Sequence, residues 1–240
     1  MIVLFTDFGL AGPYTGQVKA VLQRHAPGLP VIDLFADAPE RNPRAAAYLL
    51  AAYAPWFPPG SVFLAVIDPG VGGERAPLIV EADERCFVGP DNGLFEIVLR
   101  RAAQAQVREI AWRPEELSAS FHGRDLFAPV AALLARGEGP ASTARTVASV
   151  RRTDWPDDLA EIVYVDLYGN AMTGLRAARI AGARLRIGGQ LIPQARTFSD
   201  VPAGQPLWYE NSNGLAEIAV NLGRASETLA LAIGSKIGIE

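Results

Sequence analysis

Short apolar runs alternate with helix-like hydrophobic periodicity over the first part of the chain. The runs cover residues 2–5, 31–34, 62–67, 78–80 and 86–88. They are continuous rather than alternating, which is typical of strands buried on both faces of a parallel sheet. Helical spacing covers residues 15–28, 42–53, 94–105 and 128–134. Strands that alternate with helices predict an α/β N-terminal domain with a mainly parallel sheet over residues 1–140.

The pattern changes after this domain. Residues 136–158 hold several glycines and prolines and few large apolar side chains, so we expect a linker at 141–158. The apolar runs beyond it are short and lack helical spacing, and they cover residues 162–165, 185–187, 191–192, 207–209 and 218–220. Gly188-Gly189 between two of them is typical of a hairpin turn. We therefore expect a small antiparallel β domain, barrel-like in form, over residues 159–240.

Composition and charge exclude several classes of partner. The 240 residues carry a formal net charge of −4 and no basic stripe, so we expect no nucleic-acid partner. The first residues lack the features of a signal peptide, and the longest apolar stretch, residues 45–57, is too short to span a bilayer. The single cysteine, Cys86, cannot form an internal disulfide. We expect a cytoplasmic protein without a membrane partner.

Polar clusters border the apolar runs at four places. Three follow predicted strands and one precedes a predicted helix, at residues 6–9 (TDFG), 68–75 (DPGVGGER), 89–93 (GPDNG) and 121–125 (FHGRD). Taken singly, each is more often a structural turn, because Pro, Asp, Asn and Gly favour turns. Ligands of parallel sheets, however, bind outside the carboxyl ends of the strands. The convergence of several clusters at one sheet edge therefore favours a functional site.

Few kinds of catalytic chemistry are open to this chain. Two histidines and one cysteine disfavour a conventional zinc site. The sequence has no P-loop, no dinucleotide-binding fingerprint and no Gly-x-Ser-x-Gly nucleophile elbow. Carboxylates, an arginine and a histidine remain, and such a set can position and polarise water. A metal-dependent hydrolase that uses Asp7, Asp68, Asp91 and Asp125 stays open at this stage.

Six motifs in order resemble those of the S-adenosyl-L-methionine (SAM) hydrolases, also called SAM hydroxide adenosyltransferases, which are relatives of the fluorinases and chlorinases. The motifs are TDFG at 6–9, DPGVG at 68–72, GPDNG at 89–93, FHGRD at 121–125, DLYGN at 166–170 and NSNG at 211–214. Each motif alone is weak, but six in order are specific. The resemblance covers nearly the whole chain and implies hydrolysis of SAM to adenosine and methionine.

The resemblance also implies a role for each matched residue. Asp68, Arg75 and His122 fall on the catalytic triad that holds the attacking water. Asp7 falls on the carboxylate that binds the ribose hydroxyls. The implied substrate-binding residues are Asp7, Phe8, Phe121, Asp166, Tyr168, Asn170, Ser212, Asn221 and Leu222. Of these, Asp166 and Ser212 match methionine contacts, Asn170, Asn221 and Leu222 match adenine contacts, and Phe121 and Tyr168 match apolar walls.

Family members form homotrimers with sites between the N-terminal domain of one subunit and the C-terminal domain of the next, so the resemblance implies the same assembly here. It implies no metal and no cofactor, because SAM is the substrate and its sulfonium is already an activated leaving group. Two routes to an activated water stay open. Either His122 or Asp68 accepts its proton, or the charge of Arg75 lowers its pKa.

Two other activities stay open alongside hydrolysis. A halide-using SAM transferase would share the fold, but the presence of Asp68 and His122 favours water as the nucleophile. Gly123 stands where fluorinases have a serine at the halide site, which argues against fluoride. A protein that binds SAM or adenosine without turnover is the alternative from another class.

Overall fold

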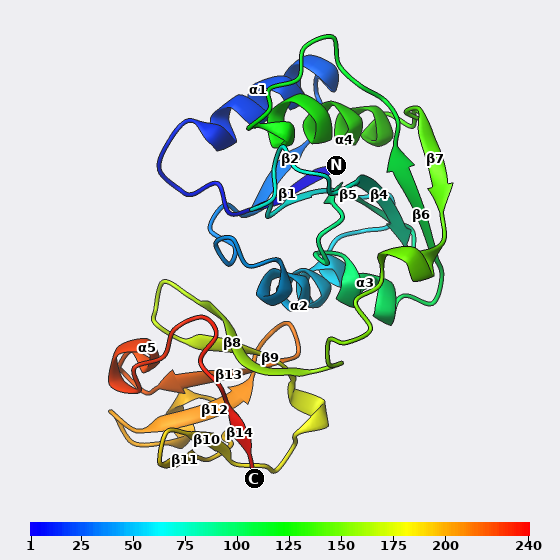
Figure 1. The fold of residues 1–240 in the computed structure, drawn as a ribbon. Coiled ribbons are helices and arrows are strands. Elements are labelled where there is room, and N and C mark those ends of the chain that lie inside the picture. The colour runs from blue at the N-terminus through cyan, green and yellow to red at the C-terminus, as the bar shows by residue number, and fades with distance from the viewer. The chain divides into compact units, whose positions relative to one another are not determined.

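A seven-stranded mixed sheet lies at the centre of the N-terminal unit, Met1–Thr153, of the computed structural model, which describes residues 1–240 (Figure 1). In sheet order its strands are β2 (Val31–Phe35), β1 (Ile2–Thr6), β3 (Val62–Val66), β5 (Arg85–Pro90), β4 (Pro77–Ala82), β6 (Ala105–Ile110) and β7 (Ser142–Arg145). Strands β2, β1, β3 and β5 pair in parallel, and β4 and β7 run antiparallel to their neighbours. Five strands therefore share one direction, which confirms the predicted, mostly parallel sheet.

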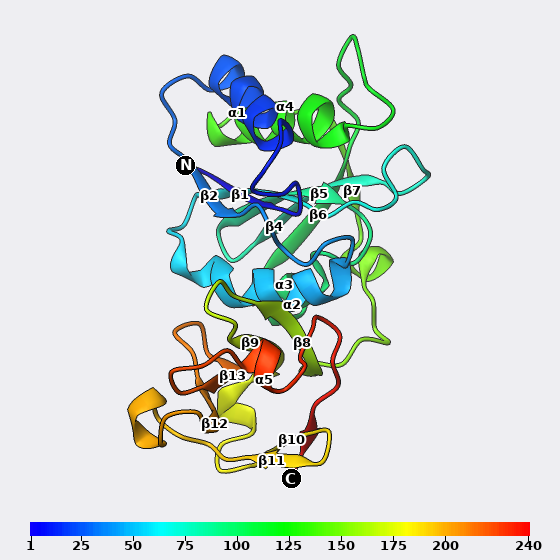
Figure 2. The same cartoon turned by 90° about the vertical axis from the view of Figure 1, so that its left-hand side faces the viewer.

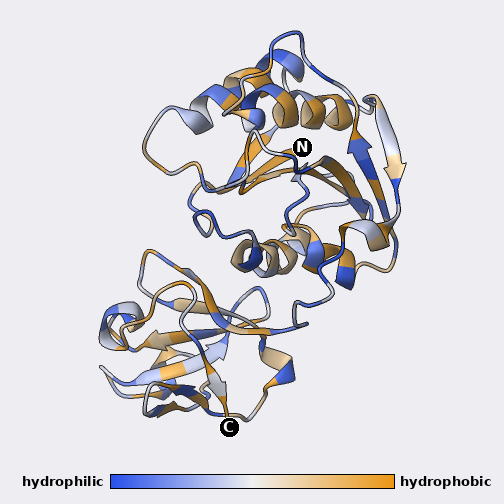
Figure 3. Ribbon diagram, viewed as in Figure 1, coloured by the Kyte–Doolittle hydropathy of each residue, from blue (hydrophilic) through white to orange (hydrophobic).

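Helices cover both faces of this sheet. Figures 1 and 2 show α1 (Tyr14–His25) and α4 (Ala128–Ala135) on one face, and α2 (Pro43–Tyr53) and α3 (Glu96–Arg101) on the other. Every residue of β1 and β3 is buried, which explains why these strands are continuously apolar. The hydrophobic colour in Figure 3 is accordingly concentrated in the central strands and in α4.

Helix α2 begins at the predicted residues. The side chain of Asn42 accepts a hydrogen bond of 3.0 Å from the backbone N–H of Ala45, and Pro43 occupies the first helical position. Asparagine satisfies one of the free N–H groups at a helix start, and proline has no N–H that would need a partner there.

The structure differs from the sequence analysis between residues 94 and 110. The predicted helix over residues 94–105 ends at Arg101, and Ala105 begins strand β6. The Asp83 carboxylate in the β4–β5 turn accepts hydrogen bonds from the backbone N–H groups of Ala103 and Gln104. Pairing of β6 with β4 across the sheet therefore outweighs the local helical preference of these residues.

The expected linker, residues 141–158, is also different in the structure. Ser142–Arg145 forms the edge strand β7. The fully buried carboxylate of Glu96 accepts hydrogen bonds from the side chain of Arg151 and the backbone N–H of Arg152. These contacts attach the segment to α3, so the N-terminal unit extends to Thr153 instead of ending near residue 140.

The C-terminal unit, Asp154–Glu240, is built from two antiparallel sheets, as predicted. One has the order β12 (Pro206–Glu210), β13 (Leu215–Val220), β9 (Ala171–Arg176) and β8 (Leu159–Val165); the other has the order β11 (Gln190–Ile192), β10 (Leu185–Ile187) and β14 (Gly238–Ile239). A single bridge between Gln194 and Trp208 connects the β11 edge of one sheet to the β12 edge of the other. A second bridge, between Glu161 and Lys236, connects the β8 edge to the β14 edge. The strands therefore form a closed, barrel-like ring around the buried Trp208.

The predicted hairpin at Gly188-Gly189 is present between β10 and β11, with Ile187 paired to Gln190. Sequence analysis missed β9, whose interior Gly174 would place a Cβ 2.7 Å from that of Leu159. A short helix, α5 (Ala225–Thr228), lies between β13 and β14. In neither unit is there a helix with the length and apolar character needed to cross a bilayer.

Candidate active site

The candidate site lies at the carboxyl ends of β1 and β3. These neighbouring strands pair in parallel, with Thr6 opposite Val66. Asp7 follows directly after β1, and Asp68 follows two residues after the end of β3. The shared direction of the strands thus brings two carboxylates that are far apart in sequence to one edge of the sheet, as the sequence analysis expected.

Arg75 connects the two other predicted catalytic residues. Its Nε atom donates to both carboxylate oxygens of Asp68, at 3.1 and 3.0 Å, and its Nη2 atom forms the ion pair with Oδ2. The same Nη2 lies 2.9 Å from Nδ1 of His122. The side chains of Arg75 and Asp68 are only 11% and 5% exposed, so water screens this pair weakly. The structure therefore brings together all three residues of the predicted triad.

The contact with Arg75 fixes the protonation state of His122. A guanidinium only donates hydrogen bonds, so Nδ1 must accept, and the ring proton lies on Nε2. Burial lowers the pKa of His122, and the nearby positive charge of Arg75 lowers it further, against smaller opposing effects of Asp68 and Asp125. Neutral His122 therefore offers an N–H donor, and not an acceptor, at Nε2.

A π-helix over Gly123–Phe127 follows His122 directly and continues into α4. Such segments are rare, and they are frequently found at functional sites. Gly123 within it lies against two aromatic rings. A Cβ at this position would lie 2.7 Å from Cζ of Phe8 and 3.4 Å from Cε2 of Phe121. The missing side chain is therefore what allows Phe8 to pack against residue 123, next to His122 in the chain.

These residues line a cavity of about 670 Å³. The predicted site residues Asp7, Asp68 and His122 line it, and its aromatic wall consists of Phe8, Tyr14 and Phe121. Phe121 packs edge-to-face against both other rings, with centroids at 5.6 and 5.4 Å, and the Arg124 guanidinium lies over its face. The cavity thus combines an aromatic wall with two carboxylates, and Arg41 and Arg124 also line it.

Other cluster residues do not line this cavity. In the GPDNG motif, Asn92 donates from Nδ2 to the carbonyl of Ile67, just before Asp68, and Asp91 pairs with Arg152. Asp125 pairs with Arg124 and accepts a hydrogen bond from the backbone N–H of Ser118. Nowhere in the structure do three His, Cys, Asp or Glu side chains gather as metal ligands would. The GPDNG motif therefore supports the backbone next to Asp68 without lining the cavity.

The remaining predicted substrate-binding residues belong to the C-terminal unit. The carboxylate of Asp166 accepts hydrogen bonds from the backbone N–H and the side-chain amide of Asn170, at 2.8 and 3.1 Å. The loop that carries them lies beside the loop of Asn221 and Leu222, because Arg224 donates to the carbonyl of Leu167. Ser212 is exposed in the β12–β13 turn.

Three large apolar side chains on these two loops are exposed to solvent. Leu167 is 85%, Tyr168 is 73% and Leu222 is 90% exposed. Leu222 also has a positive φ of 55°, which is uncommon for a residue with a side chain. Exposed apolar side chains that gather in this way are typical of binding surfaces.

A buried carboxylate beneath these loops was missed by the sequence analysis. Glu217 is 3% exposed and accepts hydrogen bonds from Tyr209 and from Nδ2 of Asn211. Burial raises the pKa of Glu217, and the nearby Asp166 raises it further. Glu217 therefore holds Asn211 of the NSNG turn from within the unit. Its position in an apolar strand pattern gave no signal of this contact.

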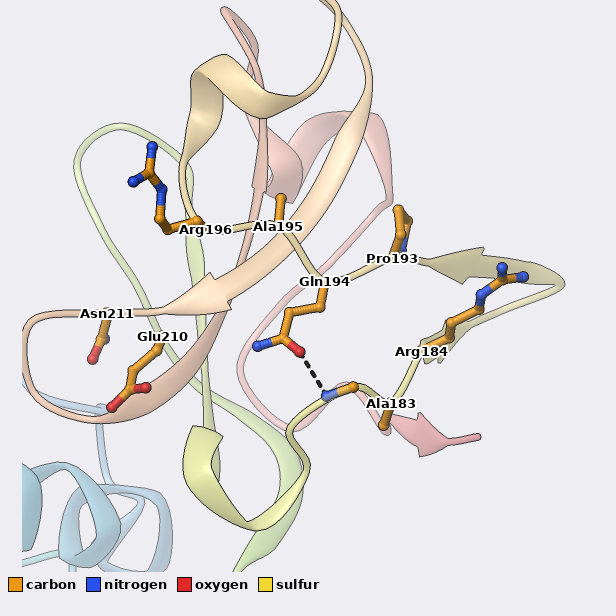
Figure 4. A pocket seen from close by; sticks show the side chains of 9 residues that line it. Ala183, Arg184, Pro193, Gln194, Ala195, Arg196, Glu210 and Asn211 are labelled. Carbon is orange, nitrogen blue, oxygen red and sulfur yellow. Dashed lines mark hydrogen bonds between the residues drawn. The ribbon is translucent and has the colours of Figure 1, made fainter.

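A second hollow, of about 870 Å³, lies on the C-terminal unit and contains none of the predicted site residues. Figure 4 shows Gln194 at its centre, bonded to the backbone N–H of Gly182, with Arg184 and Arg196 pointing outward. Asn211 is already engaged with Glu217. This hollow is larger than the first but holds no group with catalytic geometry.

The sequence matches the profile of the SAM hydroxide adenosyltransferase N-terminal domain over residues 2–144 and that of the C-terminal domain over residues 160–238. The chain belongs to the SAM hydroxide adenosyltransferase family. A Thermus thermophilus protein named (R)-S-adenosyl-L-methionine hydrolase is 40% identical, with 98% of each chain covered. A Salinispora arenicola protein of the same name is 35% identical over 98% of this chain and 95% of its own.

Solved structures resemble both units of this SAM hydroxide adenosyltransferase family member. A crystal structure of a conserved protein from Thermotoga maritima aligns with a TM-score of 0.85 at 33% identity, over 100% of this chain and 99% of the other. A conserved hypothetical protein from Thermus thermophilus aligns with a TM-score of 0.80 at 37% identity, also over 100% and 99%.

Several cavity residues of this family member were not identified from the sequence: Tyr14, Gln17, Arg41, Ser118 and Ser120. Arg124 also lines the cavity and lies in the FHGRD motif, but no role was predicted for it. Tyr14 and Gln17 stand three positions apart at the start of a helix that follows a strand. This spacing places both side chains on one face of the helix, which could have indicated that they line the same site. Ser118 and Ser120 lie in an irregular loop, and no sequence pattern distinguished them.

We expect Gly123→Ala to weaken substrate binding, because the new Cβ would displace the Phe8 ring into the cavity. The KM of the reaction should rise by about tenfold, the equivalent of about 1.4 kcal/mol. Gly16→Ala is the matched control, since nothing lies within 4 Å of a Cβ at Gly16 on α1. An unchanged KM in Gly123→Ala would contradict the packing argument.

We expect His122 to titrate below the usual histidine pKa of about 6.5, because burial and Arg75 favour its neutral form. Activity that needs neutral His122 should therefore be lost only as pH falls through this lowered pKa. With two histidines in the chain, an NMR titration of the ring protons can measure it, and His25→Gln identifies the second signal. A His122 midpoint above 6.5 would contradict the lowered pKa and the neutral state assigned to His122.

Proposed function

We propose that this protein hydrolyses SAM to adenosine and L-methionine. The observation that carries the proposal is the Arg75 guanidinium, which holds Asp68 and His122 together at the wall of the cavity. A carboxylate and a neutral imidazole N–H at one wall can orient a water molecule between them. Membership of the SAM hydroxide adenosyltransferase family and the relatives named (R)-S-adenosyl-L-methionine hydrolase support the same activity.

The reaction needs little more than a well-placed water. The water oxygen attacks C5′ of SAM, the C5′–S bond breaks, and its electron pair stays on sulfur, which leaves methionine as a neutral thioether. The proton lost by the water completes the balance. Because the sulfonium is already activated, the reaction is proposed to use no metal and no cofactor. Holding the water in line with sulfur supplies the main rate gain, since oriented reactants reach effective molarities on the order of 10⁵ M or more.

The geometry favours Asp68 over His122 as the proton acceptor. His122 accepts from Arg75 at Nδ1, so its Nε2–H can only donate to the water oxygen. Asp68 keeps lone pairs free besides its contacts with Arg75, and it lines the cavity. The role of Arg75 is then to hold Asp68 and His122 in position, and not to lower the pKa of the water by its charge alone. His122 orients the water, and Asp68 draws away its proton.

Asp7 and the aromatic wall complete the substrate contacts within the N-terminal unit. Asp7 lines the cavity and accepts a hydrogen bond of 2.9 Å from the backbone N–H of Arg41. Burial raises the pKa of Asp7, and the neighbouring carboxylates of Glu40 and Asp68 raise it further. We propose that Asp7 binds the ribose hydroxyls and that Phe8 and Phe121 form the apolar wall.

We further propose that the protein is a homotrimer in which the C-terminal unit of a neighbouring copy completes each site. The exposed Leu167, Tyr168 and Leu222 support an interface at these loops. Asp166 and Ser212 would bind methionine there, and Asn170, Asn221 and Leu222 would contact adenine. The compartment is proposed to be the cytoplasm, with which the single cysteine is compatible.

The activity is tested by incubating the purified protein with SAM in chloride buffer made with ¹⁸O-water. We expect adenosine that carries ¹⁸O at its 5′ position, together with an equal amount of methionine. 5′-Chloro-5′-deoxyadenosine would identify a halide-using enzyme instead. Bound but intact SAM would identify a binding protein without turnover.

The roles within the triad predict an order among variants. Asp68→Ala and His122→Ala should each lower kcat by about 10²–10⁴-fold while SAM still binds, because positioning and proton acceptance act on the chemical step. His122→Gln retains an N–H donor and should lose less than Asp68→Asn, which loses the proton acceptor. Single-turnover rates and calorimetry measure the two quantities. Equal losses in His122→Gln and Asp68→Asn would contradict the assignment of roles.

The shared site is tested by complementation. Asp68→Ala and Asp166→Ala should each be nearly inactive alone, but a refolded mixture of the two should regain turnover, since some sites would combine two intact halves. A mixture of Asp68→Ala with His122→Ala is the matched control and should stay inactive, because both changes lie in the same unit. A monomer by light scattering, or no regained turnover, would contradict the shared site.

A further inference from the structure

The loop after β2 is hydrogen-bonded to the turn that carries Asp7. The backbone N–H of Ala38 donates to the carbonyl of Thr6 at 3.0 Å, and the N–H of Gly9 donates to the carbonyl of Ala36 at 2.6 Å. These bonds flank Asp7 on both sides. The segment between β2 and α2 therefore decides how the Asp7 turn is held.

Arg41 is the residue of this loop that contacts the Asp7 carboxylate. It has a φ of 50°, in the left-handed region that residues with side chains rarely adopt. In this conformation its backbone N–H donates to Oδ2 of Asp7 at 2.9 Å. The next residue, Asn42, is held by its own bond to the carbonyl of Pro39 and by its capping of α2. Unfavourable backbone conformations that persist under such constraint are typical of functional sites.

The side chain of Arg41 does not hold Asp7. Its guanidinium pairs with Glu40 at 2.9 Å, and the two side chains are 75% and 72% exposed. The contact with Asp7 is thus made by the main chain alone. Any residue that can adopt the left-handed conformation at position 41 would supply the same donor.

The bond to Arg41 matters because Asp7 must offer a charged, oriented carboxylate to the substrate. Burial and the charges of Glu40 and Asp68 raise the pKa of Asp7, and the N–H of Arg41 opposes them by stabilising the carboxylate. Because Oδ2 accepts this hydrogen bond, rotation of the carboxylate is restricted, and we infer that Oδ1 accepts from a ribose hydroxyl. A fixed group loses less conformational freedom on binding than a rotating one.

We propose that Arg41 is a positioning residue whose backbone N–H, presented by a left-handed main-chain conformation, orients the Asp7 carboxylate for the ribose hydroxyls of the substrate. This inference rests on the proposed ribose-binding role of Asp7. It assigns the function to the conformation of residue 41 and not to its side chain.

The test compares three substitutions at position 41. Arg41→Gly keeps the N–H and favours the left-handed conformation, Arg41→Ala keeps the N–H at moderate strain, and Arg41→Val disfavours the conformation strongly. We expect the dissociation constant for adenosine, measured by calorimetry, to rise by about tenfold in Arg41→Val relative to the wild type. In Arg41→Gly the rise should be much smaller. In turnover of SAM, Arg41→Val should raise KM and leave kcat within about twofold.

Two controls separate positioning from general destabilisation. Glu84 in the β4–β5 turn has a φ of 64° and lies outside the cavity, so Glu84→Val should lower the melting temperature without changing adenosine binding. A ligand without ribose hydroxyls, 2′,3′-dideoxyadenosine, should bind to Arg41→Val and to the wild type with similar affinity. If Arg41→Val does not fold, Arg41→Ala is compared with Arg41→Gly instead. Alanine strains the left-handed conformation less than valine does, so adenosine should bind more weakly to Arg41→Ala than to Arg41→Gly, by a smaller factor.

Equal weakening by Gly, Ala and Val would overturn the proposal, because it would show that the Arg41 side chain makes the contact. Equal weakening of adenosine and its dideoxy analogue, or no adenosine binding to the wild type, would overturn it as well. Failure of the proposed function looks different. In that case the wild type binds adenosine with the expected dependence on position 41 but forms no adenosine from SAM.

Discussion

The ion pair between Arg75 and Asp68, extended by the contact of Arg75 with His122, is the interaction on which the site depends. One guanidinium fixes the orientation of a carboxylate and the tautomer of an imidazole, because it can only donate hydrogen bonds. Both charged side chains are nearly buried, so removing one partner would leave an uncompensated charge in a poorly solvated place. The chemistry of the cavity therefore follows from the placement of a single side chain.

The surrounding structure serves to hold this arrangement in position. The parallel pairing of β1 and β3 sets Asp7 and Asp68 at neighbouring strand ends, and Asn92 fastens the carbonyl just before Asp68. Arg41 binds the Asp7 carboxylate from the other side. The polar groups of the site are thus fixed by bonds within the N-terminal unit, from the Arg75 side chain to Asp68 and His122 and from the main chain of Arg41 to Asp7. Such bonds reduce the reorganisation that a substrate would otherwise have to induce.

The C-terminal unit has a different design. The loops that carry its matched residues are supported by a closed ring of strands around Trp208, and the buried Glu217 accepts a hydrogen bond from Asn211 of the NSNG turn. Leu167, Tyr168 and Leu222 on these loops remain exposed. A small barrel that presents apolar loops suits the recognition of a flat aromatic ligand, whereas the charged groups of the predicted triad belong to the N-terminal unit.

The sequence by itself determined the two-part architecture and the buried strands, because continuous apolar runs follow directly from the burial of a parallel sheet. The triad residues were predicted only from the resemblance of six motifs to those of the SAM hydrolases. Only the tertiary structure placed β6 and β7 in the sheet, since their pairing depends on partners distant in the chain. It alone also showed that Arg75 bridges Asp68 and His122, that Glu217 lies buried beneath the loops, and that Arg41 holds Asp7. These contacts join residues through hydrogen bonds between separate elements, and local patterns of residue type carry no information about such bonds.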